Sequence, residues 1–144
     1  ADDERRRAVE AAPDDPVVLA AVGGVLAARQ GAEREEGRRL LERAVRLDPS
    51  AADAWVGLAR LALDAGDARS TRRCASRAVA LAPGDAAAWY LLSRAAYATG
   101  DPASGRSALV RSRAVQQRRF APARAVGMAF RQPDDPALRL AVAR

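Results

Sequence analysis

The sequence contains no histidine and a single cysteine, Cys74, in 144 residues. Without histidine there can be no catalytic imidazole and no His-ligated metal, and one cysteine excludes an intramolecular disulfide and a thiolate metal cluster. Glycine-rich phosphate loops, nucleophile motifs and paired carboxylates in a catalytic spacing are also missing. We therefore expect a protein that is not an enzyme and that needs neither a cofactor nor a metal.

Aromatic residues are scarce, at 4% of the chain, and long apolar runs are absent. The longest run, Val17–Ala28, has twelve residues, whereas a transmembrane helix needs roughly twenty. Alanine is abundant instead, which favours closely packed helices over a β sandwich built from β-branched and aromatic residues. With 49% hydrophobic and 29% charged residues, the composition is that of a folded protein, and the cytoplasm is its default location.

Lysine, isoleucine and asparagine are absent, so all 24 basic residues are arginine. Because the missing residues share AT-rich codons, we interpret their absence as the property of a GC-rich, bacterial genome. Residues 1–67 hold 10 Arg and 14 acidic residues, for a net charge of −4, and residues 68–144 hold 14 Arg and 4 acidic residues, for +10. The basic half suits an acidic peptide, an acidic protein surface or nucleic acid, or is simply a solvated helical surface.

A period of 34 residues organises the chain. Small or apolar residues recur at i, i+3, i+4 and i+7 from Trp55 and again from Trp89, which is the pattern of one helix face. Gly-Asp at 66–67 and at 100–101 is expected to end this helix and to cap a second one. Each repeat is therefore predicted to be a helical hairpin. Seven pairs share the spacing: Ala44/Ala78, Pro49/Pro83, Trp55/Trp89, Leu58/Leu92, Arg60/Arg94, Gly66/Gly100 and Asp67/Asp101.

The repeat resembles that of the tetratricopeptide family, whose 34-residue unit has the pattern W-x₂-L-G-x₂-Y…A-x₃-F…A…P. The resemblance implies an all-α fold, a right-handed α-solenoid of tetratricopeptide helical hairpins with about nine helices. It also implies that the first helix of each repeat lines the concave side. Trp55 and Trp89 are expected to be the largest contributors to the core. The residues that carry the resemblance are Trp55, Leu58, Ala59, Gly66, Ala78 and Pro83.

The repeat frame treats residues 1–144 as a single array. Residues 2–12 are the second helix of a truncated repeat, residues 16–51, 52–85 and 86–119 are full repeats, and residues 120–144 are a partial repeat. The first full repeat is two residues longer than the others, and we expect the extra residues in the loop at 31–36. Arg113-Ala114-Val115 lies 36 residues after Arg77-Ala78-Val79, so the register of the last repeat stays open by two residues.

The resemblance assigns the concave groove to positions two, five, nine and twelve of each first helix. Tyr90, Arg94 and Tyr97 share one helix face there, and Tyr and Arg are enriched in binding hot spots. Two alternatives remain open, namely that Tyr97 packs inward and that Arg60 pairs with Asp64, four residues later. The candidate ligand-binding residues are Val56, Arg60, Tyr90, Arg94, Tyr97 and Arg124.

The sequence thus predicts a protein-interaction scaffold that holds a peptide segment or a partner protein, acidic in character, in its concave groove. The alternative is a structural segment of a larger repeat protein that self-associates through the ends of its array. Nucleic-acid binding by the basic half is less favoured, because the chain has few aromatic residues to form a stacking platform.

Overall fold

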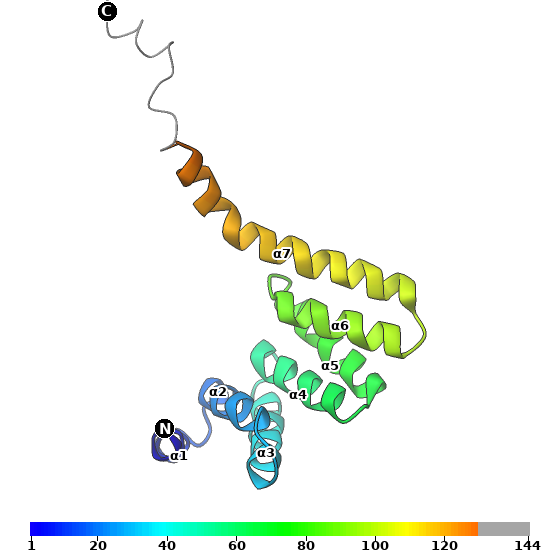
Figure 1. The fold of residues 1–144 in the computed structure, drawn as a ribbon. Coiled ribbons are helices and arrows are strands. Elements are labelled where there is room, and N and C mark those ends of the chain that lie inside the picture. The colour runs from blue at the N-terminus through cyan, green and yellow to red at the C-terminus, as the bar shows by residue number, and fades with distance from the viewer. Residues whose placement is uncertain (130–144) are drawn as a thin grey trace, which may run out of the picture.

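The computed structural model describes residues 1–129, and the side chains of residues 1–119. All secondary structure in this part of the chain is helical. Figure 1 shows the helices following one another as hairpins, with α7 extending beyond the end of α6. The predicted all-α fold of helical hairpins is confirmed. No helix within residues 1–129 combines the length and the apolar character needed to span a bilayer. The helices are α1 (Asp2–Ala11), α2 (Pro16–Ala27), α3 (Ala32–Leu47), α4 (Ala52–Asp64), α5 (Ala68–Leu81), α6 (Ala86–Ala98) and α7 (Pro102–Ala129).

Short capped turns set the boundaries between these helices. Gly66 and Gly100 have φ angles of 76° and 78°, in the left-handed region that glycine tolerates best. Each precedes an aspartate, Asp67 or Asp101, whose Oδ1 accepts a hydrogen bond from the backbone N–H three residues later, at 3.0 Å and 3.1 Å. The predicted role of the two Gly-Asp pairs is confirmed.

The helices form an inner and an outer layer. The hairpins are α2–α3, α4–α5 and α6–α7, and neighbouring first helices also contact each other, α2 with α4 and α4 with α6. Within residues 1–129, the backbones of the second helices α3, α5 and α7 make no comparable contact. Because the first helices lie closer together, they form the concave side of the array and the second helices form the convex side.

The core consists of two clusters that meet at α4. The first joins α2, α3 and α4, and its most buried members include Leu19 and Leu41, both fully buried. The second joins α4, α5 and α6 around Ala59, Ala75 and Ala88. Small residues dominate both clusters, so the helices approach closely, as the alanine content predicts.

The two tryptophans occupy the edge of the core, contrary to expectation. Trp55 and Trp89 are only half-buried. Trp55 packs against the second core cluster, and the Arg111 guanidinium lies over the Trp89 ring, 5.1 Å from its centroid. Each indole N–H donates to the carbonyl of a proline six residues earlier, Pro49 at 2.9 Å and Pro83 at 2.8 Å. Since the indole nitrogen needs a polar partner, the ring stays where the preceding turn can supply one.

The two extra residues of the first full repeat lengthen a helix rather than a loop. α3 begins at Ala32 and has 16 residues, whereas the equivalent helix α5 has 14. The expectation that residues 31–36 form an enlarged loop is therefore wrong. The sequence from 32 to 36 is rich in alanine, glutamate and arginine, which are good helix formers.

The last helix also departs from the repeat pattern. α7 runs unbroken from Pro102 to Ala129, across positions 119 and 120, where the repeat frame predicts a boundary. Pro49 and Pro83 stop the earlier second helices, but the equivalent position here is Gln117, which keeps its backbone N–H and lets the helix continue. The described residues form seven helices, where about nine were predicted for the chain. The remainder of the predicted partial repeat, residues 130–144, lies outside the described residues.

The register of α7 up to residue 119 follows the 34-residue frame. Ser112, which is 34 residues after Ala78, is 3% exposed, and its Oγ donates to the Ala86 carbonyl at 2.8 Å. Ala114, the counterpart of Ala78 in the alternative register, is exposed. The packing of α7 on α6 therefore resolves the two-residue ambiguity in favour of the regular repeat.

Candidate ligand-binding groove

The concave face of α4 carries two exposed charges with a buried residue between them. Asp53 and Arg60 are both exposed and lie seven residues apart, so they share one helix face. Val56, between them, is only 9% exposed and belongs to the second core cluster. Val56, one of the predicted contact residues, thus lies in the floor beneath the groove and offers a ligand little surface.

Arg60 does not form the intrahelical pair that the sequence left open. Asp64, at the end of α4, is paired instead with Arg34 at the start of α3, in the neighbouring hairpin. In the part of the chain whose side chains are described, Arg60 takes part in no ion pair. Its guanidinium is therefore accessible to a ligand.

On α6, two of the predicted contact residues touch each other. Tyr90 is 45% exposed, and Arg94 donates from Nη1 to the Tyr90 hydroxyl at 3.2 Å. Arg94 is exposed as well, and no carboxylate of residues 1–119 pairs with it. The bond holds the guanidinium beside the phenol without neutralising its charge.

Tyr97 lies against the next helix and is neither buried nor free. It is 44% exposed, and a Cβ added at Gly105 of α7 would come within 2.8 Å of its ring. The ring therefore rests on the α7 backbone, where the buried Ser93 hydroxyl also donates to the Gly105 carbonyl at 2.8 Å. Glycine at position 105 provides the room that the ring needs.

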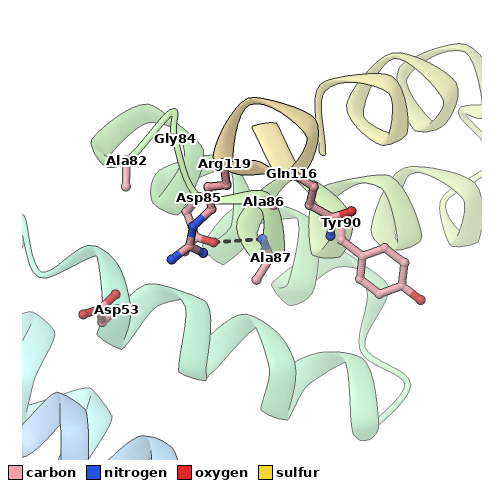
Figure 2. Close-up of a pocket in the computed structure, with 9 residues that line it drawn as sticks. All are labelled: Asp53, Ala82, Gly84, Asp85, Ala86, Ala87, Tyr90, Gln116 and Arg119. Carbon is pink, nitrogen blue, oxygen red and sulfur yellow. Dashed lines mark hydrogen bonds between the residues drawn. The ribbon is translucent and has the colours of Figure 1, made fainter. Parts of the chain in front are cut away.

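An open recess of about 1130 Å³ lies between α4 and the α6–α7 hairpin (Figure 2). The recess extends the concave face from Tyr90, past the N-terminal end of α6, to Gln116 and Arg119 of α7. Sequence reasoning overlooked Gln116 and Arg119 of α7, because the family pattern places the groove on first helices only. The absence of proline at 117 was the signal available for them. The recess is lined by Asp53, Ala82, Gly84, Asp85, Ala86, Ala87, Tyr90, Gln116 and Arg119.

The charged residues of the recess have different roles. Asp85 caps α6, and its Oδ1 accepts hydrogen bonds from the N–H groups of Ala87 at 2.8 Å and Ala88 at 3.4 Å. Arg119 of α7 is exposed and contributes a positive charge to the recess. Arg124, the remaining predicted contact, lies in α7 but beyond the residues whose side chains are described.

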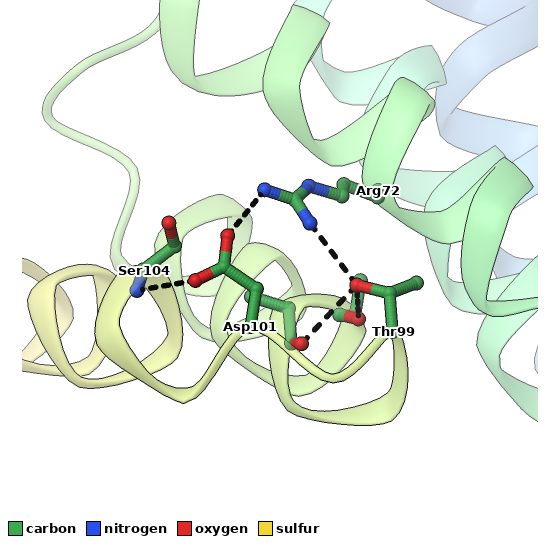
Figure 3. A network of polar contacts seen from close by, with 6 residues as sticks. Arg72, Thr99, Asp101 and Ser104 are labelled. Carbon is green, nitrogen blue, oxygen red and sulfur yellow. Dashed lines mark hydrogen bonds and ion pairs between the residues drawn. The ribbon is translucent and has the colours of Figure 1, made fainter.

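A polar network between α5 and the turn from α6 to α7 holds the last two hairpins together (Figure 3). Arg72 of α5 donates to Asp101 Oδ2 at 2.8 Å and to Thr99 Oγ1 at 3.0 Å. Hydrogen bonds from Ser104, together with the Arg72 guanidinium, lower the pKa of Asp101 to about 2. The network therefore joins an outer helix of one repeat to the turn of the next and helps to set the spacing of α4 and α6.

The single thiol has no place in the groove. Cys74 is 6% exposed within the second core cluster, and burial raises its pKa, so the thiol stays protonated. It behaves as a small apolar side chain.

Comparison with known proteins supports the repeat assignment. A sequence profile described as "Tetratricopeptide repeat" matches residues 24–69 and 57–122, more than half of the chain. A solved structure titled "MamA MSR-1 C2" has a similar fold, with a TM-score of 0.61 and 15% sequence identity. The match covers 79% of this chain and 64% of that chain, so this chain spans less than two thirds of its length. No curated protein sequence matches.

Proposed function

The chain belongs to the tetratricopeptide repeat family, whose repeats generally act as protein-interaction scaffolds, and from this premise we propose that its groove binds an extended acidic segment of a partner protein. The observation that carries the proposal is the pair Arg60 and Arg94. They occupy equivalent positions on neighbouring inner helices, both are exposed, and neither has an ion-pair partner within residues 1–119.

The chemistry of these side chains fits carboxylates. A guanidinium binds a carboxylate through two parallel N–H···O bonds, and such charge-assisted bonds are roughly twice as strong as neutral ones. Packed helices lie about 8–10 Å apart, so acidic residues two or three positions apart in an extended segment can reach both arginines. Tyr90, already bonded to Arg94, supplies an aromatic surface for the apolar part of the segment.

The test is the loss of binding when Arg94 is shortened. Acidic peptides selected by display against the wild-type protein are titrated against Arg94→Ala, which we expect to bind about thirtyfold more weakly, since a central Arg anchor contributes about 2 kcal/mol. The melting temperature should stay unchanged because Arg94 lies outside the core. Arg118→Ala is the matched control, because Arg118 is an exposed arginine of the second helix α7, outside the inner helices α4 and α6 that carry Arg60 and Arg94. Equal binding by wild type and Arg94→Ala would contradict the proposal.

A second candidate is an anionic partner held by α7. This helix contains six arginines and no acidic residue among its 28 positions. If that partner were nucleic acid, its affinity would fall steeply with salt concentration, and Arg118→Ala would weaken binding as much as Arg94→Ala. The groove proposal predicts that only the Arg94 variant loses affinity.

A further inference from the structure

We propose that the groove is dipolar and selects a segment that carries a basic residue as well as an acidic one. The basic residue is held at Asp53 and the acidic residue at Arg60. This inference rests on the proposed function, since it concerns the same groove and assigns the acidic residue to Arg60, and it adds a second charge of the ligand along α4.

The first reason is the arrangement of charges along α4. Asp53 lies in the first turn of the helix and Arg60 two turns later, about 10.5 Å along the axis. Both side chains are exposed on the concave face, with Val56 beneath them. Neither side chain has a hydrogen-bond or ion-pair partner among residues 1–119, although most other aspartates of this part of the chain are paired or act as caps.

The second reason is the position of Asp53 in the lining of the recess, next to the groove. Among the described residues that line the recess, Asp53 is the one charged side chain from α4. On the opposite side, Asp85 is already bonded to the backbone of α6, and Arg119 of α7 has the opposite charge. Figure 2 shows Asp53 on its own helix, apart from these residues. Among residues 1–119 the Asp53 carboxylate forms no ion pair, with Arg119 or any other residue, and the recess is open enough to admit a long basic side chain.

The spacing suits an extended ligand. In a polyproline II segment, residues i and i+3 lie on the same side, about 9 Å apart, which is close to the separation of Asp53 and Arg60 along α4. A segment with glutamate and lysine three positions apart can therefore place one charge at each end of the helix face. A segment with two acidic residues at this spacing must bring one of them next to Asp53.

The experiment compares three proline-rich peptides that differ only at positions i and i+3, carrying Glu and Lys, Glu and Glu, or Gln and Gln. We expect the wild-type protein to bind the Glu/Lys peptide about fivefold more tightly than the Glu/Glu peptide, the size of an exposed ion pair gained. Asp53→Asn should remove this preference, and Asp53→Lys should reverse it. Asp3→Lys is the matched control, because Asp3 is also an exposed aspartate in the first turn of a helix, far from the recess.

The outcomes separate this inference from the proposed function. If wild type binds the Glu/Glu peptide as tightly as the Glu/Lys peptide, or if Asp53→Lys does not reverse the order, the dipolar groove is wrong and acidic binding at the arginines still stands. If Asp3→Lys changes the preference as much as Asp53→Lys, overall charge rather than Asp53 is responsible, and the inference is also overturned. If neither peptide with glutamate binds better than Gln/Gln, both the inference and the proposed function fail.

Discussion

At the scale of single residues, small side chains determine how closely the helices pack. At the crossing of α2 and α3, a Cβ added to Gly37 would lie 2.4 Å from the Ala27 nitrogen and 2.8 Å from the Gly23 carbonyl oxygen. Both are backbone atoms and cannot move aside without separating the helices. Gly24, one residue further along α2 from Gly23, has open space around it, and a Cβ added there would meet no atom within 4 Å.

These two glycines give a matched pair of stability predictions. Gly24→Ala should stabilise the protein by about 0.5–1 kcal/mol, because alanine loses less backbone freedom in a helix and meets no neighbour. Gly37→Ala should destabilise it by about 1–3 kcal/mol, the usual cost of overpacking, since α2 and α3 must move apart. Urea denaturation of both variants measures the difference. A Gly37→Ala protein as stable as wild type would contradict the observed helix crossing.

The positions of the groove residues could be predicted from the sequence, but their contacts could not. The resemblance to the tetratricopeptide repeat assigns Arg60, Tyr90 and Arg94 to the groove side of the first helices, and all three side chains are exposed in the structure. The partner of Asp64 and the support beneath Tyr97 depend on distances between helices, which periodicity does not contain. Val56 illustrates the same limit. The resemblance assigns it to the groove, but its burial depends on the neighbouring alanines of α5 and α6, whose distance the repeat pattern does not give.

At the scale of the helical elements, the proline at the end of each second helix is the most informative signal. Pro49 and Pro83 predict the ends of α3 and α5, which stop at Leu47 and Leu81. The repeat frame also predicted a turn near residue 119, although Gln117 replaces the proline there. Gln117 accounts for the continuation of α7 past residue 119, because it keeps the backbone N–H that a proline at this position would remove.

The link between α5 and α7 predicts a dependence of stability on pH. The pKa of Asp101 is lowered from 3.8 to about 2 in the folded protein by Ser104 and Arg72. Because the folded pKa lies below the unfolded one, this carboxylate stabilises the fold fully above about pH 4, and its contribution is lost as the pH falls towards 2. Asp101→Asn keeps a side-chain oxygen for the cap but cannot titrate. Its melting temperature should therefore fall less than that of wild type between pH 5 and pH 2, and parallel acid profiles for the two proteins would contradict this.

At the scale of the whole molecule, α4 holds the described part of the array together. Its residues Ala54 and Leu61 belong to the first core cluster, whereas Val56 and Ala59 belong to the second. In a repeat array each hairpin contacts only its neighbours, so stability is transmitted along the chain through such shared helices. The groove residues Asp53 and Arg60 are on this same helix, which gives the candidate site a rigid base.

The opposite case is α1, which has no buried residue, whose backbone contacts only α2 among the described helices, and of which Val9 packs at the edge of the first core cluster. The ion pair of Asp2 with Arg29 helps to hold it, and exposed pairs of this kind contribute little. Hydrogen exchange followed by mass spectrometry should therefore show the amides of α1 exchanging first and those of α4 and α5 last. Arg29→Ala should speed exchange in α1 further and leave α4 unchanged, because Arg29 lies outside both core clusters. If α1 were as protected as α4, the helix would have to be held by more than this ion pair and these contacts, and the order of stability along the array would be wrong.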